Sequence, residues 1–283
     1  MPGEECVRVG CQGWNYDDWI TGPASADKIF YPQGTRPAAM LDLYARAFET
    51  VEVDSTFYAI PSAQTIEGWK RRTPERFSFA LKLPQEITHA RALRDGSPAL
   101  LAEFSARARL LDDKLAAVLI QLPPQFLPSL ENKEALREFV PHLPRDMRFA
   151  IEFRDTNWLR QRGLAEFLRG YNVALALVEG PWLRRERVLR WAAAEEPTAD
   201  FAYLRWMGER DLTRFDTTQR AQDQNLRDWS GIAAALCRKL PHVFAYFSNY
   251  YEGHAPASAN KLKRMLGQPV KEARDLEDQP SLF

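Results

Sequence analysis

Short stretches in which apolar and polar residues alternate recur along the chain, and most are followed by a segment with helical spacing. Alternation with a period of two predicts a strand, because successive side chains of a strand point to opposite faces. In the helical segments apolar residues recur every three or four positions, as at Leu41, Tyr44, Ala45 and Phe48. The pattern predicts eight strands, at residues 7–11, 51–54, 77–82, 116–122, 148–154, 173–178, 201–205 and 243–247.

Strands that alternate with helices or helix-sized connections predict a parallel sheet covered by helices. Eight such units within 283 residues favour a closed (β/α)8 TIM barrel over an open, doubly wound sheet. Several strands, such as 148–154, have one apolar and one polar face, whereas strands of an open parallel sheet are apolar on both. The sequence also lacks the G-x-G-x-x-G fingerprint of dinucleotide-binding folds. We therefore predict a single barrel domain at 1–267 and a polar tail at 268–283.

Composition adds a few limits to this picture. The 38 basic and 38 acidic residues balance, so no net charge attracts nucleic acid or an anionic membrane. Cys6, Cys11 and Cys237 lie far apart without a C-x-x-C motif, and we interpret them as buried or incidental thiols of a reducing compartment. The sequence shows no signal-peptide pattern and no apolar run of transmembrane length. These features predict a cytoplasmic protein.

The stretch 51–58 (Val-Glu-Val-Asp-Ser-Thr-Phe-Tyr) is acidic on one face and apolar on the other. With other motifs in the same order it resembles the YecE-like family (domain of unknown function 72). The motifs that carry this resemblance are Gly10-Cys11-Gln12-Gly13-Trp14 with Tyr16 and Trp19, Phe30-Tyr31-Pro32, Lys82, Thr88-His89, Gln121-Leu122-Pro123-Pro124, Glu152-Phe153-Arg154 with Trp158, and Asp200-Phe201 with Tyr203 and Arg205.

The resemblance runs from about residue 8 to about residue 266 and implies a TIM-barrel fold, but it supplies no activity. The chain departs from the family pattern in two places. Met207-Gly208 stands where the family tends to have His before Gly, and Ser248-Asn249 stands where it tends to have paired Asn. A role that requires that histidine is therefore not carried over to this chain.

Active sites of TIM barrels lie at the carboxyl ends of the strands, so polar residues at these ends are the candidate site. We predict Asp54 and Glu152 as catalytic residues. The predicted substrate-binding residues are Gln12, Trp14, Tyr16, Thr56, Tyr58, Lys82, His89, Gln121, Arg154, Trp158, Arg205, Asn249 and Tyr250. For Glu52 and Arg8, which lie lower in their strands, we predict a structural role, since a buried charge must be paired.

Two carboxylates among aromatic side chains suit general acid–base chemistry on a sugar ring, including glycoside cleavage. The cations Lys82, Arg154 and Arg205 suit a phosphate or carboxylate instead. A ligand that carries both a ring and an anionic group, such as a sugar phosphate or a nucleotide, satisfies both. The sequence thus favours a hydrolase or lyase for such a small molecule, although the same charges can also be structural pairs and the aromatic residues can simply cap the barrel.

Other chemistries have weaker support. His89, His254, Asp54 and Glu152 lie on the correct side for a divalent ion, but they lack the spacing of a metal motif, and we predict no cofactor. No G-x-S-x-G elbow is present, and Cys11 faces the helices. The competing class is a non-enzymatic or nucleic-acid-binding protein that uses Arg184, Arg185 and Arg187 beside Trp182 and Trp191, but we favour a solvated helix face as the explanation of these residues. Oligomeric state cannot be deduced from the sequence.

Overall fold

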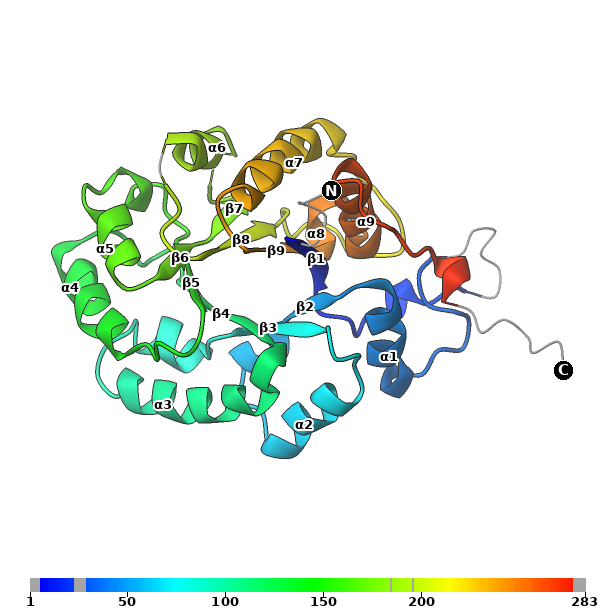
Figure 1. Cartoon of the computed structure of the whole chain (residues 1–283), viewed down its shortest axis with the longest axis horizontal. Helices are drawn as coiled ribbons and strands as arrows, with labels where there is room; N and C mark the ends of the chain where they lie inside the picture. The colour runs from blue at the N-terminus through cyan, green and yellow to red at the C-terminus, as the bar shows by residue number, and fades with distance from the viewer. Residues whose placement is uncertain (1–5, 23–28, 184, 195, 277–283) are drawn as a thin grey trace, which may run out of the picture.

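Parallel strands surround a common axis, and helices form a ring outside them (Figure 1). This computed structural model describes residues 6–22, 29–183, 185–194 and 196–276. Its strands are β1 (Val7–Gln12), β2 (Thr50–Val53), β3 (Ser78–Lys82), β4 (Leu115–Gln121), β5 (Phe149–Glu152), β6 (Val173–Leu175), β7 (Leu177–Glu179), β8 (Phe201–Trp206) and β9 (His242–Phe247). They form one sheet in the order β6-β5-β4-β3-β2-β1-β9-β8-β7, and the fold is the predicted TIM barrel.

One stretch of chain, residues 173–179, accounts for both ends of this order. β6 pairs with β5, and β7 pairs with β8. The residue between them, Ala176, donates its N–H to the Ile151 carbonyl at 2.9 Å, so the ladder with β5 continues past the end of β6. β6 and β7 are therefore the single predicted strand 173–178, which turns from one neighbour to the other. The prediction of eight strands is confirmed when the two are counted together.

The helices follow the local signals in the sequence. Pro37 opens the first long helix, and Ser62 and Ser129 cap two others by accepting the N–H of Thr65 at 3.1 Å and of Asn132 at 3.2 Å. The α-helices are α1 (Pro37–Ala47), α2 (Ala63–Arg71), α3 (Ser97–Ala108), α4 (Leu130–Phe139), α5 (Leu164–Gly170), α6 (Arg185–Ala194), α7 (Asp223–Cys237), α8 (Asn249–Glu252) and α9 (Ala255–Met265). A 3₁₀ turn, Asp54–Phe57, directly follows β2, and a π-helical turn, Glu86–Ala90, follows β3.

Polar side chains line the barrel axis in layers. Near the middle, the Tyr246 hydroxyl lies 2.8 Å from the Thr50 hydroxyl, which in turn lies 3.1 Å from that of Ser78. These residues belong to β9, β2 and β3, and β9 and β2 are not neighbours, so the contact crosses the interior. The layer above it, toward the carboxyl ends of the strands, is charged. The layer below contains Arg8 of β1 and Phe244 of β9, which are paired in register.

The bonding state of two cysteines differs from the one interpreted from the sequence. Cys6 and Cys237 form a disulfide, although 231 positions separate them, and only Cys11 is a free, buried thiol. The Cys6 carbonyl accepts the N–H of Val243 at 2.9 Å, which places the residue before β1 beside the start of β9. Cys237 ends α7, shortly before β9, and its Cα atom lies 5.8 Å from that of Cys6. The interpretation of Cys6 and Cys237 as free thiols was wrong because tertiary structure alone brings them together.

The first part of the predicted tail contacts the barrel. Gln268 donates its side-chain N–H to the Val7 carbonyl at 2.7 Å, and Leu276 is buried in the core. Residues 277–283 lie outside the described residues, and the domain boundary at 267 stays a prediction. No helix within the described part of the chain combines the length and the apolar character needed to cross a membrane.

Candidate functional site

Arg205 forms the centre of a buried ionic network at the carboxyl ends of the strands. Its Nε and Nη2 atoms donate to the Glu52 carboxylate at 2.9 and 2.5 Å, and Nη1 donates to Glu152 from the other side. Tyr203 adds its hydroxyl to Glu52 at 2.7 Å. Glu52 and Glu152 are 0 % exposed and Arg205 is 1 % exposed, so all three charges depend on one another for compensation.

The pKa values follow from this pairing. Burial opposes the charge of Arg205, but Glu152 and Glu52 outweigh it and raise the pKa of the guanidinium. Burial alone would raise the pKa of Glu152, yet Arg205 and Arg154 together hold that pKa below its usual value. Glu152 is therefore a stable carboxylate whose two oxygens are both occupied by arginines. The predicted structural role of Glu52 as partner of an interior cation agrees with these contacts.

A more accessible pair of charges lies beside this network. The Lys82 Nζ atom is 3.8 Å from an oxygen of Asp54, and the Asp54 side chain is 38 % exposed. Thr56 accepts the backbone N–H of Lys82 at 2.9 Å and thereby fixes the end of β3 against the turn after β2. The Lys82 ammonium also lies 4.2 Å above the ring of Phe57, and burial lowers its pKa. Thr56 thus positions Lys82, and Asp54 keeps free acceptor capacity.

Arg154 extends the network outward. Its Nε atom donates to Glu152 at 3.0 Å, and its guanidinium stacks on Trp182 with the carbon 4.0 Å from the ring centre. Within the described part of the chain, no bond is formed by its two terminal nitrogens. One edge of this guanidinium is therefore fixed and the other edge is available.

His89 completes the accessible groups. Its ring packs edge-on against Phe57 at 4.9 Å, and its Nδ1 atom lies 2.8 Å from the Thr88 hydroxyl. Burial and the nearby cations Arg154 and Lys82 lower the pKa of His89 to about 4. The imidazole is therefore neutral at pH 7, with Nε2 not engaged by any residue that the structure describes.

Besides Arg205 and Thr56, four more of the predicted binding residues are held inside the protein. Gln12 and Gln121 are almost fully buried; Gln12 donates to the Met207 sulfur at 3.1 Å, and Gln121 lies 3.5 Å from Arg205. Trp158 is stacked between Phe126 and Phe153. Asn249 accepts the indole N–H of Trp19 at 3.1 Å. These contacts support the barrel and its loops, and the predicted contact of these side chains with a substrate has no support in the geometry.

The predicted aromatic residues lie on the rim in different environments. Tyr58 is 72 % exposed, Trp14 packs edge-on against Trp69, and Tyr16 donates to the Gln12 carbonyl at 3.0 Å. Tyr250 packs edge-on against Phe215, a residue of the loop after β8. Tyr58 alone among these is fully open to a ligand.

Two residues at the site were absent from the predicted substrate-binding set. Phe57 lies under Lys82 and beside His89, and Trp182 lies under Arg154. Phe57 belongs to the stretch that was singled out but was not selected; strand parity does not apply to it, because the strand ends at Val53 and a 3₁₀ turn follows. Trp182 follows the carboxyl end of β7, which is the signal that could have identified it.

Metal coordination was also considered for Asp54, Glu152, His89 and His254. His254 is buried and packs edge-on against Trp19. Among the residues that the structure describes, no three His, Cys, Asp or Glu side chains are grouped so that they could hold a metal ion.

The geometry defines a TIM-barrel protein with a charged, partly accessible site at the carboxyl ends of its strands. The chain belongs to the family described as Protein of unknown function DUF72, whose model matches residues 8–281. It is similar to the UPF0759 protein YunF of Bacillus subtilis, with 29% identity over 92% of this chain and 94% of that protein. It is also similar to the UPF0759 protein YecE of Escherichia coli O157:H7, with 25% identity over 79% and 82% of the two chains.

A solved structure agrees with the barrel. The crystal structure of a DUF72 family protein from Thermotoga maritima superimposes with a TM-score of 0.75 at 26% identity, over 93% of this chain and all of that one. The family resemblance deduced from the strand-end motifs is thereby confirmed.

Proposed function

We propose that this protein is an enzyme, a hydrolase or lyase, that acts on a small molecule with both an anionic group and a ring. One observation carries the proposal. Lys82 and His89 pack on Phe57, Asp54 lies beside Lys82, and Arg154 binds Glu152. These four groups, from the ends of three strands, keep polar atoms free of the other described residues, whereas the buried Glu152 and Arg205 beside them are paired.

Lys82 and Arg154 supply the anion-binding part of the site. Arg205 is excluded from this role because two glutamates already neutralise it. The free edge of Arg154 suits two oxygens of a phosphate or carboxylate, and Lys82 adds a point charge that Asp54 only loosely compensates at 3.8 Å. The anionic group of the substrate would displace Lys82 from Asp54, which frees the carboxylate for chemistry.

Exposed aromatic surface supplies the ring-binding part. Tyr58 is the most exposed aromatic residue here and packs edge-on against Phe57 at 5.3 Å. A ring stacked on Tyr58 would hold its anionic substituent toward Lys82. Stacking of this kind is tolerant of ring type, so it fits sugars and nucleobases alike.

Asp54 and His89 are accessible groups that can take part in acid–base chemistry. Asp54 is partly exposed, and the neutral imidazole of His89 can accept or donate a proton at Nε2. Glu152, predicted from sequence as the second catalytic carboxylate, has no free oxygen, and we assign it the positioning of Arg154. The proposed pair is therefore one carboxylate and one imidazole.

The alternative of nucleic-acid binding has less support. Arg185 is paired with Asp228 at 2.6 Å, and Arg187 donates to Thr156 at 3.1 Å. Trp182 is covered by Arg154. Arg184 lies outside the described residues. The basic cluster thus offers few free groups to a phosphate backbone.

The proposal is tested by measuring turnover of a panel of sugar phosphates, nucleotides and aryl glycosides with wild-type protein and two site variants. For a substrate that is turned over, Asp54→Asn should lower kcat by about 10²–10⁴-fold, the range for loss of a general acid or base. Lys82→Met should mainly raise KM, because it removes anion binding. It should also raise the pKa of His89, measured by NMR, since a neighbouring cation is lost.

Glu67→Gln is the matched control, because Glu67 is an exposed carboxylate of α2 whose partner is the exposed Arg71. It should leave both kinetic constants unchanged. Unfolding curves of all variants establish that the fold is intact. A panel without any turnover, or an Asp54→Asn variant that retains wild-type kcat, would refute the proposed function.

A further inference from the structure

The amino-terminal end of the barrel contains a second group of cations that the proposed function does not use. Arg8 of β1, Arg148 directly before β5 and His242 at the start of β9 line one cavity of about 540 Å³. Phe244 forms part of its wall and stacks on His242 with ring centres 6.1 Å apart. The neighbouring strands β1 and β9 and the more distant β5 thus bring nitrogen-bearing side chains to one place.

The two arginines of this cavity lack compensation. Within the described part of the chain, neither Arg8 nor Arg148 forms an ion pair or a side-chain hydrogen bond. The Nε atom of Arg148 is buried and has no hydrogen-bond partner. A buried guanidinium nitrogen without an acceptor is costly, and native structures normally satisfy such a group with protein, water or a ligand.

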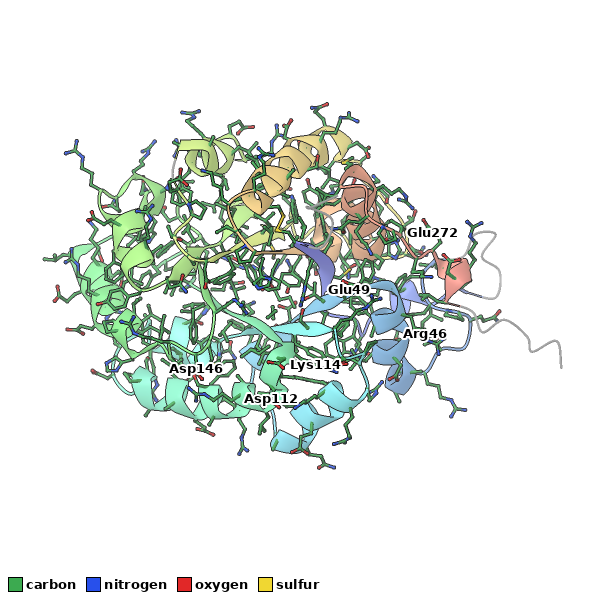
Figure 2. All side chains as sticks on the ribbon, in the orientation of Figure 1. Arg46, Glu49, Asp112, Lys114, Asp146 and Glu272 are labelled. Carbon is green, nitrogen blue, oxygen red and sulfur yellow. A yellow bond between two sulfur atoms is a disulfide. The ribbon has the colours of Figure 1, made fainter. Side chains whose placement is uncertain are left out.

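Carboxylates at the rim do not provide that compensation. Asp146 is held by Arg109 at 2.7 Å, and Asp112 pairs with Lys70. Both carboxylates precede strands β5 and β4, and both are labelled in Figure 2. Asp113 also lines the cavity and is exposed to solvent. The acidic groups thus face outward or are engaged, and the inner wall of the cavity is cationic.

We propose that this basal cavity is a binding site for a phosphate group, held by Arg8 and Arg148 with His242 as a further donor. Two guanidinium forks match the oxygens of a tetrahedral dianion. Burial together with Arg148 and Arg8 lowers the pKa of His242, as expected for an imidazole in a field of positive charge, while the exposed Asp200 acts in the opposite direction. The apolar wall, with Phe244, Met147 and Leu115, leaves room for a small organic substituent on the phosphate.

The proposal does not depend on the proposed function, because the two groups of residues lie at opposite ends of the strands. Arg8 is at the amino-terminal end of β1, whereas Lys82 and Glu152 are the last residues of β3 and β5. Either site can therefore be tested without the other.

Binding of inorganic phosphate to the full chain is the test, by isothermal titration calorimetry and by the dependence of Tm on phosphate at constant ionic strength. Wild-type protein should show saturable binding and a Tm that rises with phosphate concentration. Arg8→Gln and Arg148→Gln should each weaken binding by about tenfold or more, since each removes one charge-assisted fork. Glycerol phosphate, tested alongside, distinguishes the source: tighter binding than phosphate identifies an organic phosphate, and equal binding identifies the free ion.

Arg71→Gln is the matched control, because Arg71 is an exposed arginine whose side chain is 69% accessible on α2. It removes the same charge and should leave phosphate affinity unchanged. Arg148→Lys keeps the charge but loses the fork, so its phosphate affinity should be intermediate. This variant replaces Arg148→Gln in the test if Arg148→Gln fails to fold. The proposal is overturned if wild-type protein shows no saturable binding, if Arg71→Gln weakens binding as much as Arg148→Gln, or if Arg148→Lys binds as tightly as wild type.

Discussion

The two ends of the barrel interior carry similar side chains in different electrostatic states. At the carboxyl ends, Arg205 is enclosed by Glu52 and Glu152 and is 1 % exposed. At the amino-terminal end, Arg8 and Arg148 face a cavity without a carboxylate partner among the described residues. An interior arginine alone therefore does not mark a ligand site. It marks one only where no carboxylate of the protein compensates its charge.

The difference has a simple origin in the strands. β2 and β5 each place a glutamate in the upper layer and β8 places Arg205 there, so the arginine compensates both carboxylates across the axis. In the lower layer, β1, β9 and the residues before β5 supply Arg8, His242 and Arg148, and the aspartates of the cavity lie at its rim. At the upper end, the polar atoms that remain available to a ligand therefore belong to Asp54, Lys82 and Arg154, which lie outside the buried network.

The largest effect is expected from removing the compensated arginine. Arg205→Met leaves the buried Glu52 without a cation and Glu152 with Arg154 alone. Breaking a buried pair in this way costs about 3–5 kcal/mol of the free energy of unfolding. Urea unfolding of the purified variant measures this loss.

The control for that variant removes the charges of all three residues. Glu52→Gln combined with Arg205→Met and Glu152→Gln should recover much of the lost stability, because none of these three residues is then charged. Arg154 loses Glu152 as its partner in this variant but keeps its stacking contact with Trp182. If Arg205→Met alone unfolds at the same urea concentration as wild type, the buried glutamates do not depend on Arg205 for compensation. The electrostatic difference between the two ends of the barrel is then refuted.

An intermediate effect is expected at the amino-terminal end, where the disulfide joins β1 to α7. Cys6→Ser with Cys237→Ser should lower stability by about 2–4 kcal/mol under oxidising conditions, because the bond restricts the unfolded chain over a separation of 231 residues. Unfolding with and without a reductant measures the effect. The variant should be insensitive to the reductant, and a wild-type protein that is equally insensitive would contradict a contribution of the disulfide.

The smallest effect is expected from the exposed pair at the rim of the basal cavity. Arg109 and Asp146 are paired at 2.7 Å, but their side chains are 46% and 57% exposed. Arg109→Gln should therefore change the free energy of unfolding by less than about 1 kcal/mol, as exposed pairs do. A loss comparable with that of Arg205→Met would show that burial does not separate the two classes of ion pair. The same urea experiments provide the measurement.

Much of the candidate site could be predicted from strand ends, but the roles within it could not. Asp54, Lys82, His89 and Arg154 were placed correctly at the mouth because parity and the position of strand ends are local properties. Trp158 and Asn249 were placed in the same region, yet one is stacked in the core and the other holds a tryptophan N–H. Exposure depends on neighbouring loops, and these leave no periodic signal in the sequence.

The sequence by itself determined the barrel. Alternating positions define the strands, apolar stripes with helical spacing define the helices that cover them, and eight such units form a closed barrel. It also determined that Glu52 faces the interior, since a period of two fixes the face. Only the tertiary structure decided that Arg205 is shared by Glu52 and Glu152, that Cys6 meets Cys237, and that Arg8 and Arg148 are left uncompensated. The physical reason is distance along the chain: facing is set by adjacent residues, whereas charge compensation is set by strands that meet only when the barrel closes.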